Sequence, residues 1–199
     1  MADIRKLAPI LLRWEAGAPI YKSGRMLTLE EQWAVAKKKG FSNDPDDTGG
    51  ATMCGVTIAA YRKYRRLKGK TDPTVSELKA ISLDEWLDIL RTFYWDKMKA
   101  DQIKNQSIAN LCVDNVWGSG AGYIKQIQLV AGASPDGIVG PKTLAAINGY
   151  NQKMLFDKLW QKRKLFYHNL VIARPSNKKF LNGWLNRLND FKFEEGAGR

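Results

Sequence analysis

Three carboxylates stand close together in one short, turn-rich stretch of the sequence. Residues 41–57 read FSNDPDDTGGATMCGVT and hold three Asp, one Pro and three Gly. Pro45 restricts its own φ angle, Asp and Asn side chains bond to nearby backbone groups, and glycines accept positive φ angles. The segment is therefore predicted to be a tight loop or a small hairpin that presents carboxylates, which can act as catalytic acids or bases.

A calcium-binding loop is one alternative for this stretch. Asp44, Asp46 and Thr48, followed by Gly49, imitate the start of an EF-hand. The twelfth position counted from Asp44 is Gly55, where an EF-hand requires a bidentate Glu. We therefore predict no metal site and no cofactor here, and an ordinary solvated turn remains the plainer interpretation.

A further carboxylate, Glu15, stands at the end of a predicted helix within residues 3–16. Beside Trp14, at the end of a buried helix, a carboxylate can lose solvent, which raises its pKa. A general acid near neutral pH needs such a raised pKa. From position alone, a solvated glutamate at a helix end is the simpler interpretation. The apolar residues that recur at helical spacing are Leu7, Ile10, Leu11 and Trp14.

The stretch NDPDDTGGATMCGVT resembles the signature of glycoside hydrolase family 108, the phage-type muramidases often described as secretion activators. Members carry a Glu-Gly-Gly-aromatic motif directly before an NDP-x-D-x-GGAT-x-x-G-[IV]-T run. Here the glutamate lies further upstream, in RWEAG, and removing residues 18–40 joins EAG to FSNDPDD and restores the family's spacing. The matching positions are Asn43, Asp44, Pro45, Asp47, Gly49, Gly50, Ala51, Thr52, Gly55 and Thr57.

The resemblance implies a mainly α, lysozyme-like helical fold with a short turn or hairpin carrying the acidic loop. It also implies cleavage of the β-1,4 bond from N-acetylmuramic acid to N-acetylglucosamine, by a catalytic region over residues 1–130. Glu15 would be the general acid, Asp47 would orient water or stabilise the oxocarbenium-like transition state, and Thr52 would hydrogen-bond the water. The alternative is a non-catalytic cell-wall-binding or secretion-accessory protein, in which the 18–40 insertion has disabled the Glu15–Asp47 pair.

The 18–40 insertion is expected to be a loop followed by a helix over 29–39, with Trp33 on its apolar face. For the two carboxylates to act together, the insertion must leave and return at nearly the same point, because closure of a longer loop costs little additional entropy. We therefore expect Gly17 and Gly40 to lie close in space and helix 29–39 to flank the substrate groove. The sequence does not distinguish an insertion that walls the groove from one that is surface decoration.

The region 131–199 is expected to be helical and packed with 1–130 into one globule. Its stretch SPDGIVGPKTLAAIN resembles the DG-[IV]-x-G-P-x-T motif of peptidoglycan-binding modules. Physical chemistry alone indicates only a turn and the start of a helix with Pro141 at its first position. The resemblance implies substrate binding by Asp136, Gly137, Gly140 and Thr143.

The remaining chain is predicted to be helical, apart from possible short strands within 41–57. A basic cluster in the helix predicted over 58–67 is either a solvated face or a contact for an anionic polymer. His168 is expected to be a helix residue, and Asp114 is expected to be mainly structural. The further helices are predicted over 58–67, 82–98, 106–117, 123–130, 141–148, 151–173 and from 177.

The composition indicates an anionic partner, because the 199 residues carry a net charge of +12. No basic-aromatic nucleic-acid motif and no zinc spacing of Cys and His occurs, so nucleic acid is not expected. The family resemblance implies peptidoglycan as the partner. Cys54 and Cys112 are expected to be free thiols. Neither a signal peptide nor a membrane-spanning run is recognised. We expect a monomer made in the cytoplasm, without stable membrane insertion, that acts on the wall in the periplasm or outside after release.

Overall fold

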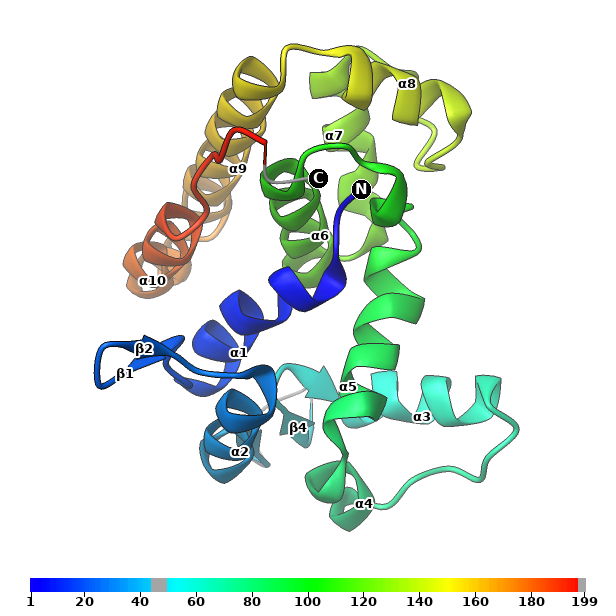
Figure 1. The fold of residues 1–199 in the computed structure, drawn as a ribbon, viewed down its shortest axis with the longest axis vertical. Coiled ribbons are helices and arrows are strands. Elements are labelled where there is room, and N and C mark those ends of the chain that lie inside the picture. The colour runs from blue at the N-terminus through cyan, green and yellow to red at the C-terminus, as the bar shows by residue number, and fades with distance from the viewer. Residues whose placement is uncertain (44–49, 197–199) are drawn as a thin grey trace. The chain divides into compact units, whose positions relative to one another are not determined.

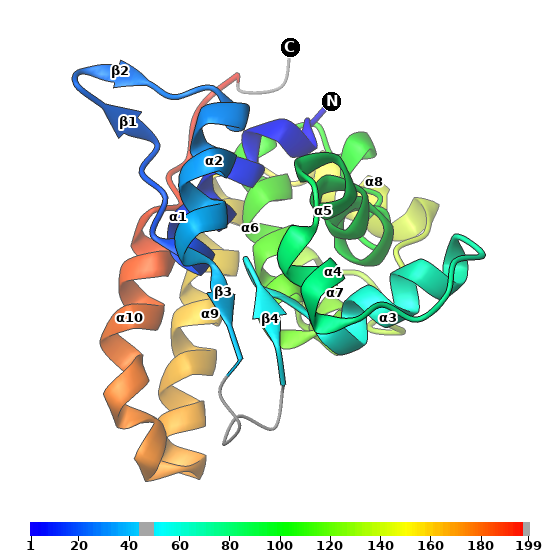
Figure 2. The ribbon, with the colours of Figure 1, turned by 90° about the horizontal axis from the view of Figure 1, so that it is seen from below.

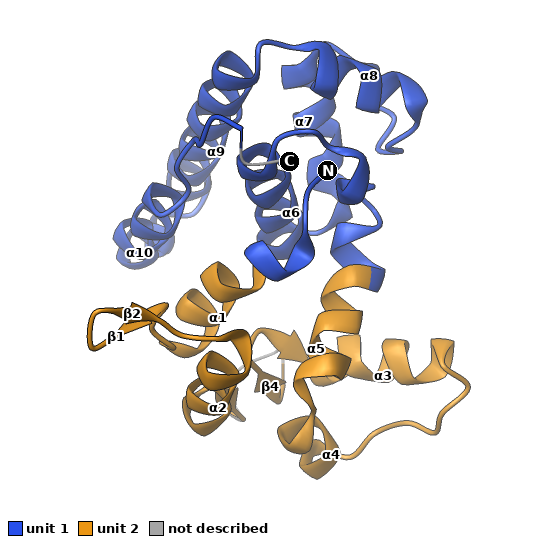
Figure 3. Ribbon diagram, viewed as in Figure 1, with its two compact units in different colours: residues 1–6, 92–199 blue, residues 7–91 orange. Residues whose placement is uncertain are grey.

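The computed structural model of the protein describes residues 1–43 and 50–196. These residues form ten α-helices and two very small sheets (Figure 1), which confirms the predicted mainly α class. They divide into two compact units (Figure 3): unit 1 contains residues 1–6 and 92–199, and unit 2 contains residues 7–91.

Unit 2 carries the acidic segment and all the short strands among the described residues. Its elements are α1 (Ala8–Ala16), β1 (Tyr21–Lys22), β2 (Arg25–Met26), α2 (Leu29–Lys39), β3 (Phe41–Ser42), β4 (Thr52–Met53), β5 (Val56–Thr57), α3 (Ile58–Leu67), α4 (Val75–Ala80) and α5 (Leu83–Leu90). A π-helical segment, η2 (Arg91–Trp95), follows α5, so the helix predicted over 82–98 is interrupted.

Unit 1 is helical throughout its described regular elements. They are η1 (Ile4–Lys6), η3 (Ala100–Gln102), α6 (Gln106–Ser119), η4 (Ala121–Tyr123), α7 (Ile124–Ala131), α8 (Pro141–Gly149), α9 (Gln152–Ala173), η5 (Pro175–Asn177) and α10 (Lys178–Asn189). The N-terminus belongs to this unit because the Ala2 N–H donates to the Ile103 carbonyl at 3.2 Å and the Asp3 N–H donates to Gln106 Oε1 at 2.7 Å.

The core of unit 1 contains Asp114, which the sequence predicted to be mainly structural. Asp114 on α6 is buried, and its Oδ1 accepts from Arg187 Nε at 3.0 Å and from Nη2 at 2.7 Å. Because removing one partner of such a pair leaves a buried charge uncompensated, the pair fixes α10 against α6. Cys112, on the same helix, is a buried free thiol, as expected.

Helix α1 begins and ends where the sequence signals place it. Pro9 lies in its first turn, where its missing N–H leaves no hydrogen bond broken. Gly17 ends it with a left-handed φ of 62°, and its N–H donates to the Leu12 carbonyl. Glu15 therefore lies in the last turn of α1, as predicted.

The 18–40 insertion begins with a β-hairpin rather than the predicted loop. β1 and β2 pair with Tyr21 opposite Met26, and the turn residues Ser23 and Gly24 take φ angles of 51° and 78°. Two residues with positive φ form the tight turn that joins antiparallel strands. The strands are only two residues long, too short for an alternating pattern to be recognised in the sequence.

The helix of the insertion is part of the unit's core, not a decoration. Helices α1 and α2 lie against each other (Figures 1 and 2), and Gln32 of α2 is buried. Its Nε2 donates to the Pro9 carbonyl at 2.9 Å and to the Ala18 carbonyl at 3.2 Å. Trp33 packs on Trp86 of α5, with 5.8 Å between ring centroids.

Candidate functional site

The acidic segment is carried by a three-stranded antiparallel sheet with one polar face. Ser42, Thr52 and Thr57 stand opposite one another on β3, β4 and β5, so their side chains share a face. The opposite face carries Met53 and Val56, which are buried. A row of hydroxyl groups therefore lies at the strands that bound the acidic segment.

Only part of the predicted catalytic set lies within the described residues. Asp47 lies outside them, as does the rest of 44–49. Thr52 is half-buried, and its hydroxyl donates to the Gly50 carbonyl at 3.3 Å. Thr57 caps α3, because its hydroxyl oxygen accepts from the Ala60 N–H at 3.2 Å. The Thr52 hydroxyl acts as a donor, so its oxygen can still accept a hydrogen bond.

Gly40 marks the point where the end of α1, the end of α2 and the sheet meet. A Cβ atom placed on Gly40 would lie 3.0 Å from the Cβ of Ala16 and 2.4 Å from the Sγ of Cys54. The Cys54 N–H donates to the Gly40 carbonyl at 2.7 Å. Because Ala16 is next to Gly17, the two ends of the 18–40 insertion return to nearly the same point, as expected.

The Cys54 thiol reports the electrostatic influence of Glu15. Burial, and secondly the negative charge of Glu15, raise the pKa of Cys54 to about 12. Cys54 lies in the turn between β4 and β5, where it has a φ of 47° and Gly55 a φ of 80°. Trp86 fixes that turn, since its Nε1 donates to the Cys54 carbonyl at 2.9 Å.

The basic cluster of α3 is paired with acidic side chains within unit 2. Arg66 donates to both oxygens of Asp72, and this hydrogen bonding lowers the pKa of Asp72. The cluster is thus largely compensated by its own neighbours, which favours a structural surface over a contact for an anionic polymer. The ion pairs are Arg62–Asp72, Arg65–Glu77, Arg66–Asp72, Lys68–Asp88 and Lys70–Glu85.

In unit 1, the predicted binding motif is organised by a residue that the sequence did not single out. Gln128 on α7 is fully buried, and its Nε2 lies 2.7 Å from Asp136 Oδ1 and 3.1 Å from Thr143 Oγ1. Its Oε1 accepts from the Gly137 N–H at 2.8 Å. Hydrogen bonds from the Ile138 N–H and from Gln128 lower the pKa of Asp136. Three of the four motif residues are therefore bonded to Gln128.

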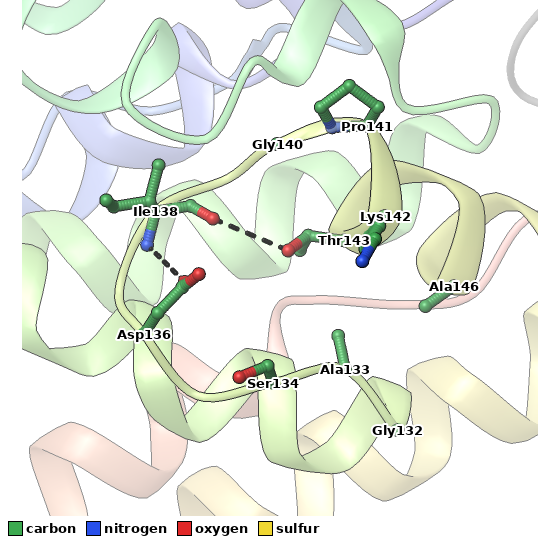
Figure 4. Close-up of a pocket in the computed structure, with 10 residues that line it drawn as sticks. All are labelled: Gly132, Ala133, Ser134, Asp136, Ile138, Gly140, Pro141, Lys142, Thr143 and Ala146. Carbon is green, nitrogen blue, oxygen red and sulfur yellow. Dashed lines mark hydrogen bonds between the residues drawn. The ribbon is translucent and has the colours of Figure 1, made fainter.

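A pocket of about 540 Å³ lies between this loop and the first turns of α8 (Figure 4). Asp136, Gly140 and Thr143 line it, as does Ile138, whose side chain is 71% exposed. The Ile138 carbonyl accepts from the Thr143 hydroxyl, which holds the loop to α8. The other lining residues are Gly132, Ala133, Ser134, Pro141, Lys142 and Ala146.

Replacing Gln128 by Ala should lower the free energy of unfolding by about 2 kcal/mol, because several buried polar groups lose their partner at once. The loop that lines the pocket should loosen, and retention of the protein by insoluble peptidoglycan should fall. Thermal melting and co-sedimentation measure the two effects. Gln126→Ala, two residues earlier on α7, is the matched control and should change neither. Parental values for both quantities in Gln128→Ala would contradict the organising role of Gln128.

Residues 32–120 match the family model described as glycosyl hydrolase 108, and residues 124–189 match the model described as a predicted peptidoglycan domain. Residues 32–120, somewhat less than half of the chain, are therefore similar to the glycosyl hydrolase 108 family. The structure described as Brucella abortus SagA is similar to this chain, with 27% sequence identity and a TM-score of 0.63. That similarity covers 76% of this chain and 82% of the other. Among the curated proteins there is no match.

The glycosyl hydrolase 108 region includes β3, β4, β5 and the acidic segment, but it begins at Gln32, within α2. Glu15 and the whole of α1 therefore precede it. The peptidoglycan domain begins with the first residue of α7 and ends with the last residue of α10. It contains Gln128 and the pocket that Gln128 organises.

Neither a group of metal ligands nor a membrane-spanning helix is found among the described residues. No group of three or more His, Cys, Asp or Glu side chains is placed there to hold a metal ion. Within the same part of the chain, no helix combines the length and apolarity that a membrane crossing requires.

Proposed function

We propose that the protein is a peptidoglycan hydrolase of the lysozyme type, an N-acetylmuramidase that cleaves the MurNAc-β-1,4-GlcNAc bond. Glu15 is the general acid, Asp47 orients water or stabilises the oxocarbenium-like transition state, and Thr52 hydrogen-bonds the water. The observation that carries the proposal is the contact of Gly40 with Ala16. It brings the last turn of α1, with Glu15, to the start of the strand that leads into the acidic segment.

The chemistry requires two polar groups on opposite sides of the scissile bond. A protonated carboxyl donates to the leaving oxygen while the second carboxylate faces the anomeric carbon. Only two residues, Phe41 and Ser42, separate Gly40 from Asn43, the first residue of the NDPDD run, and the contact of Gly40 with Ala16 supports a position of Glu15 near the base of that run. The hydroxyl row beside it supplies Thr52, which can hold a water molecule.

Unit 1 supplies the proposed wall-binding site. Asp136, Gly137 and Thr143 shape the loop through Gln128, and Gly140 precedes the first turn of α8. Contact with the glycan or its peptide then falls on the exposed groups of the pocket, the Ile138 side chain and Lys142. Apolar surface beside a few polar groups is the usual composition of such sites.

A non-catalytic wall-binding or secretion-accessory protein is the second candidate, favoured by two observations. The glycosyl hydrolase 108 match begins at Gln32, so it does not include Glu15. Directly before the acidic segment the chain carries Lys37–Lys39 and no carboxylate. An accessory protein of this kind would bind the wall without cutting it.

Digestion of purified peptidoglycan with the full-length protein distinguishes these functions. A muramidase should release fragments with reducing N-acetylmuramic acid ends, which borohydride reduces and mass spectrometry identifies. Fragments ending in anhydro sugars would instead show a lytic transglycosylase. Sedimentation with the wall and no soluble product would show the accessory protein. The wall is the substrate or the binding partner in each case, so we place the action outside the cytoplasm, in phage-type lysis, secretion or competition.

A further inference from the structure

The helical hairpin formed by α9 and α10 holds much of the protein's excess positive charge. Residues 158–189 contain eight Lys or Arg and no Asp or Glu. The two helices lie side by side and are joined by η5 (Figures 1 and 2). A charge imbalance of this size in one element indicates an anionic partner.

Two of these basic residues are already engaged inside unit 1. Arg163 is buried, with its guanidinium 4.6 Å from the ring centroid of Tyr167 and 4.8 Å from that of Tyr123. Arg187 is bonded to Asp114. Neither of them offers its charge to a partner.

Three of the six remaining basic residues lie where the two helices join, and the other three, Lys158, Lys162 and Lys164, lie earlier in α9. Arg174, Lys178 and Lys179 are all exposed, and within the described part of the chain none of them has a carboxylate partner. Arg174 Nε donates only to the Ser176 hydroxyl, at 3.2 Å, and Lys179 lies over the ring of Phe180.

Two large apolar side chains lie among these cations. Ile172 is 77% exposed and Phe180 is 48% exposed. Phe180 is held by Trp184, 5.9 Å away between ring centroids, and Trp184 stacks on the buried Tyr167 at 5.4 Å. We call Ile172, Arg174, Lys178, Lys179 and Phe180 the hairpin tip.

We propose that the hairpin tip binds the surface of an anionic phospholipid membrane. The cations match the charge of the headgroups, and Ile172 and Phe180 enter the boundary between headgroups and acyl chains, which accepts both kinds of side chain. A polymer of phosphates or sugar acids would satisfy the cations but leave Ile172 in water. The combination of the two therefore favours a membrane surface over a wall polymer or a nucleic acid.

Sedimentation of the full-length protein with vesicles tests the proposal. We expect binding to phosphatidylcholine vesicles that contain about one third phosphatidylglycerol, little binding to pure phosphatidylcholine, and weakening as salt rises from about 0.1 M to about 0.5 M. Lys178→Gln with Lys179→Gln should weaken binding by about fivefold for each cation removed. Ile172→Ser with Phe180→Ser should weaken it at low salt and at high salt alike.

The controls change two exposed lysines or one exposed apolar side chain elsewhere in unit 1. They are Lys97→Gln with Lys104→Gln, and Met154→Ser, whose side chain is 53% exposed near the start of α9. All variants should digest soluble peptidoglycan fragments at the parental rate, so a loss of membrane binding is separable from a loss of hydrolysis. Equal binding to charged and uncharged vesicles would overturn the proposal. Control variants that bind vesicles as weakly as the tip variants would also overturn it. So would tip variants that lose sedimentation with insoluble peptidoglycan while the parent binds no vesicle, because the tip would then be a wall contact.

Discussion

Replacing Glu15 by Gln should reduce the rate of peptidoglycan lysis at least about a hundredfold, the usual contribution of general acid catalysis. The amide has nearly the same shape as the carboxyl group but has no proton to transfer to the leaving oxygen. Stability should barely change, because Glu15 is half-buried at the end of α1 rather than inside the core. Turbidity of a peptidoglycan suspension and thermal melting measure the two quantities.

The control for this variant is Glu30→Gln, which removes an exposed carboxylate from the first turn of α2. It should lyse peptidoglycan at close to the parental rate. If Glu15→Gln also retains most of the activity, Glu15 is not the general acid. Complete inactivity of the parent protein on the same substrate would instead favour the accessory function, and sedimentation with the wall would then be the remaining property.

Local signals in the sequence predicted the ends of the helices well. Thr28 and Glu31 form a reciprocal capping box at the start of α2, and Gly17 takes the left-handed angle after α1. Each of these signals acts over a few residues, so it can be recognised without a fold. Thr74 and Glu77 make the same box before α4, a helix that the sequence analysis missed although its signal was present.

Buried amides could not be predicted in the same way. Gln32 bonds to the Pro9 carbonyl, and Gln128 bonds to Asp136 and Thr143 in a separate loop. A glutamine in an amphipathic pattern is expected on a surface, and only the packing of two distant segments turns it into a buried partner. The resemblance implied that the motif at 136–143 binds substrate, which stays a prediction, and no sequence pattern indicated that most of its polar groups are bonded to Gln128.

The site itself was predictable in part. The return of the 18–40 insertion to its starting point followed from the spacing of the two motifs, and the contact between Gly40 and Ala16 agrees with it. That Glu15 and Asp47 lie close enough to act together stays a prediction, because Asp47 lies outside the described residues. The closeness of Cys54 to Glu15 depends on tertiary packing and left no pattern in the sequence.

Replacing Gly40 by Ala should lower the free energy of unfolding by about 3 kcal/mol, the upper part of the range for forcing a methyl group into a packed core. The new Cβ would lie 2.4 Å from Cys54 Sγ, 2.9 Å from the Ala36 carbonyl oxygen and 3.0 Å from the Cβ of Ala16. The Cys54 side chain is fully buried and the Ala36 oxygen belongs to the backbone of α2, so neither can move aside without repacking. Denaturant-induced unfolding measures the cost.

The same substitution should also slow lysis well below the temperature at which the variant melts, because relief of the overlap must separate the end of α1 from the sheet. Glu15 moves with α1, and displacement by a fraction of an ångström to one ångström can cost about a hundredfold in rate. Gly183→Ala is the matched control: it lies within α10 with no atom near its new Cβ, and it should stabilise the helix slightly. Cys54→Ala combined with Gly40→Ala should recover part of the stability, since it removes the shortest overlap. A Gly40→Ala protein that unfolds and lyses like the parent would show that the three elements do not need to meet at Gly40, and the placement of Glu15 beside the acidic segment would lose its structural support.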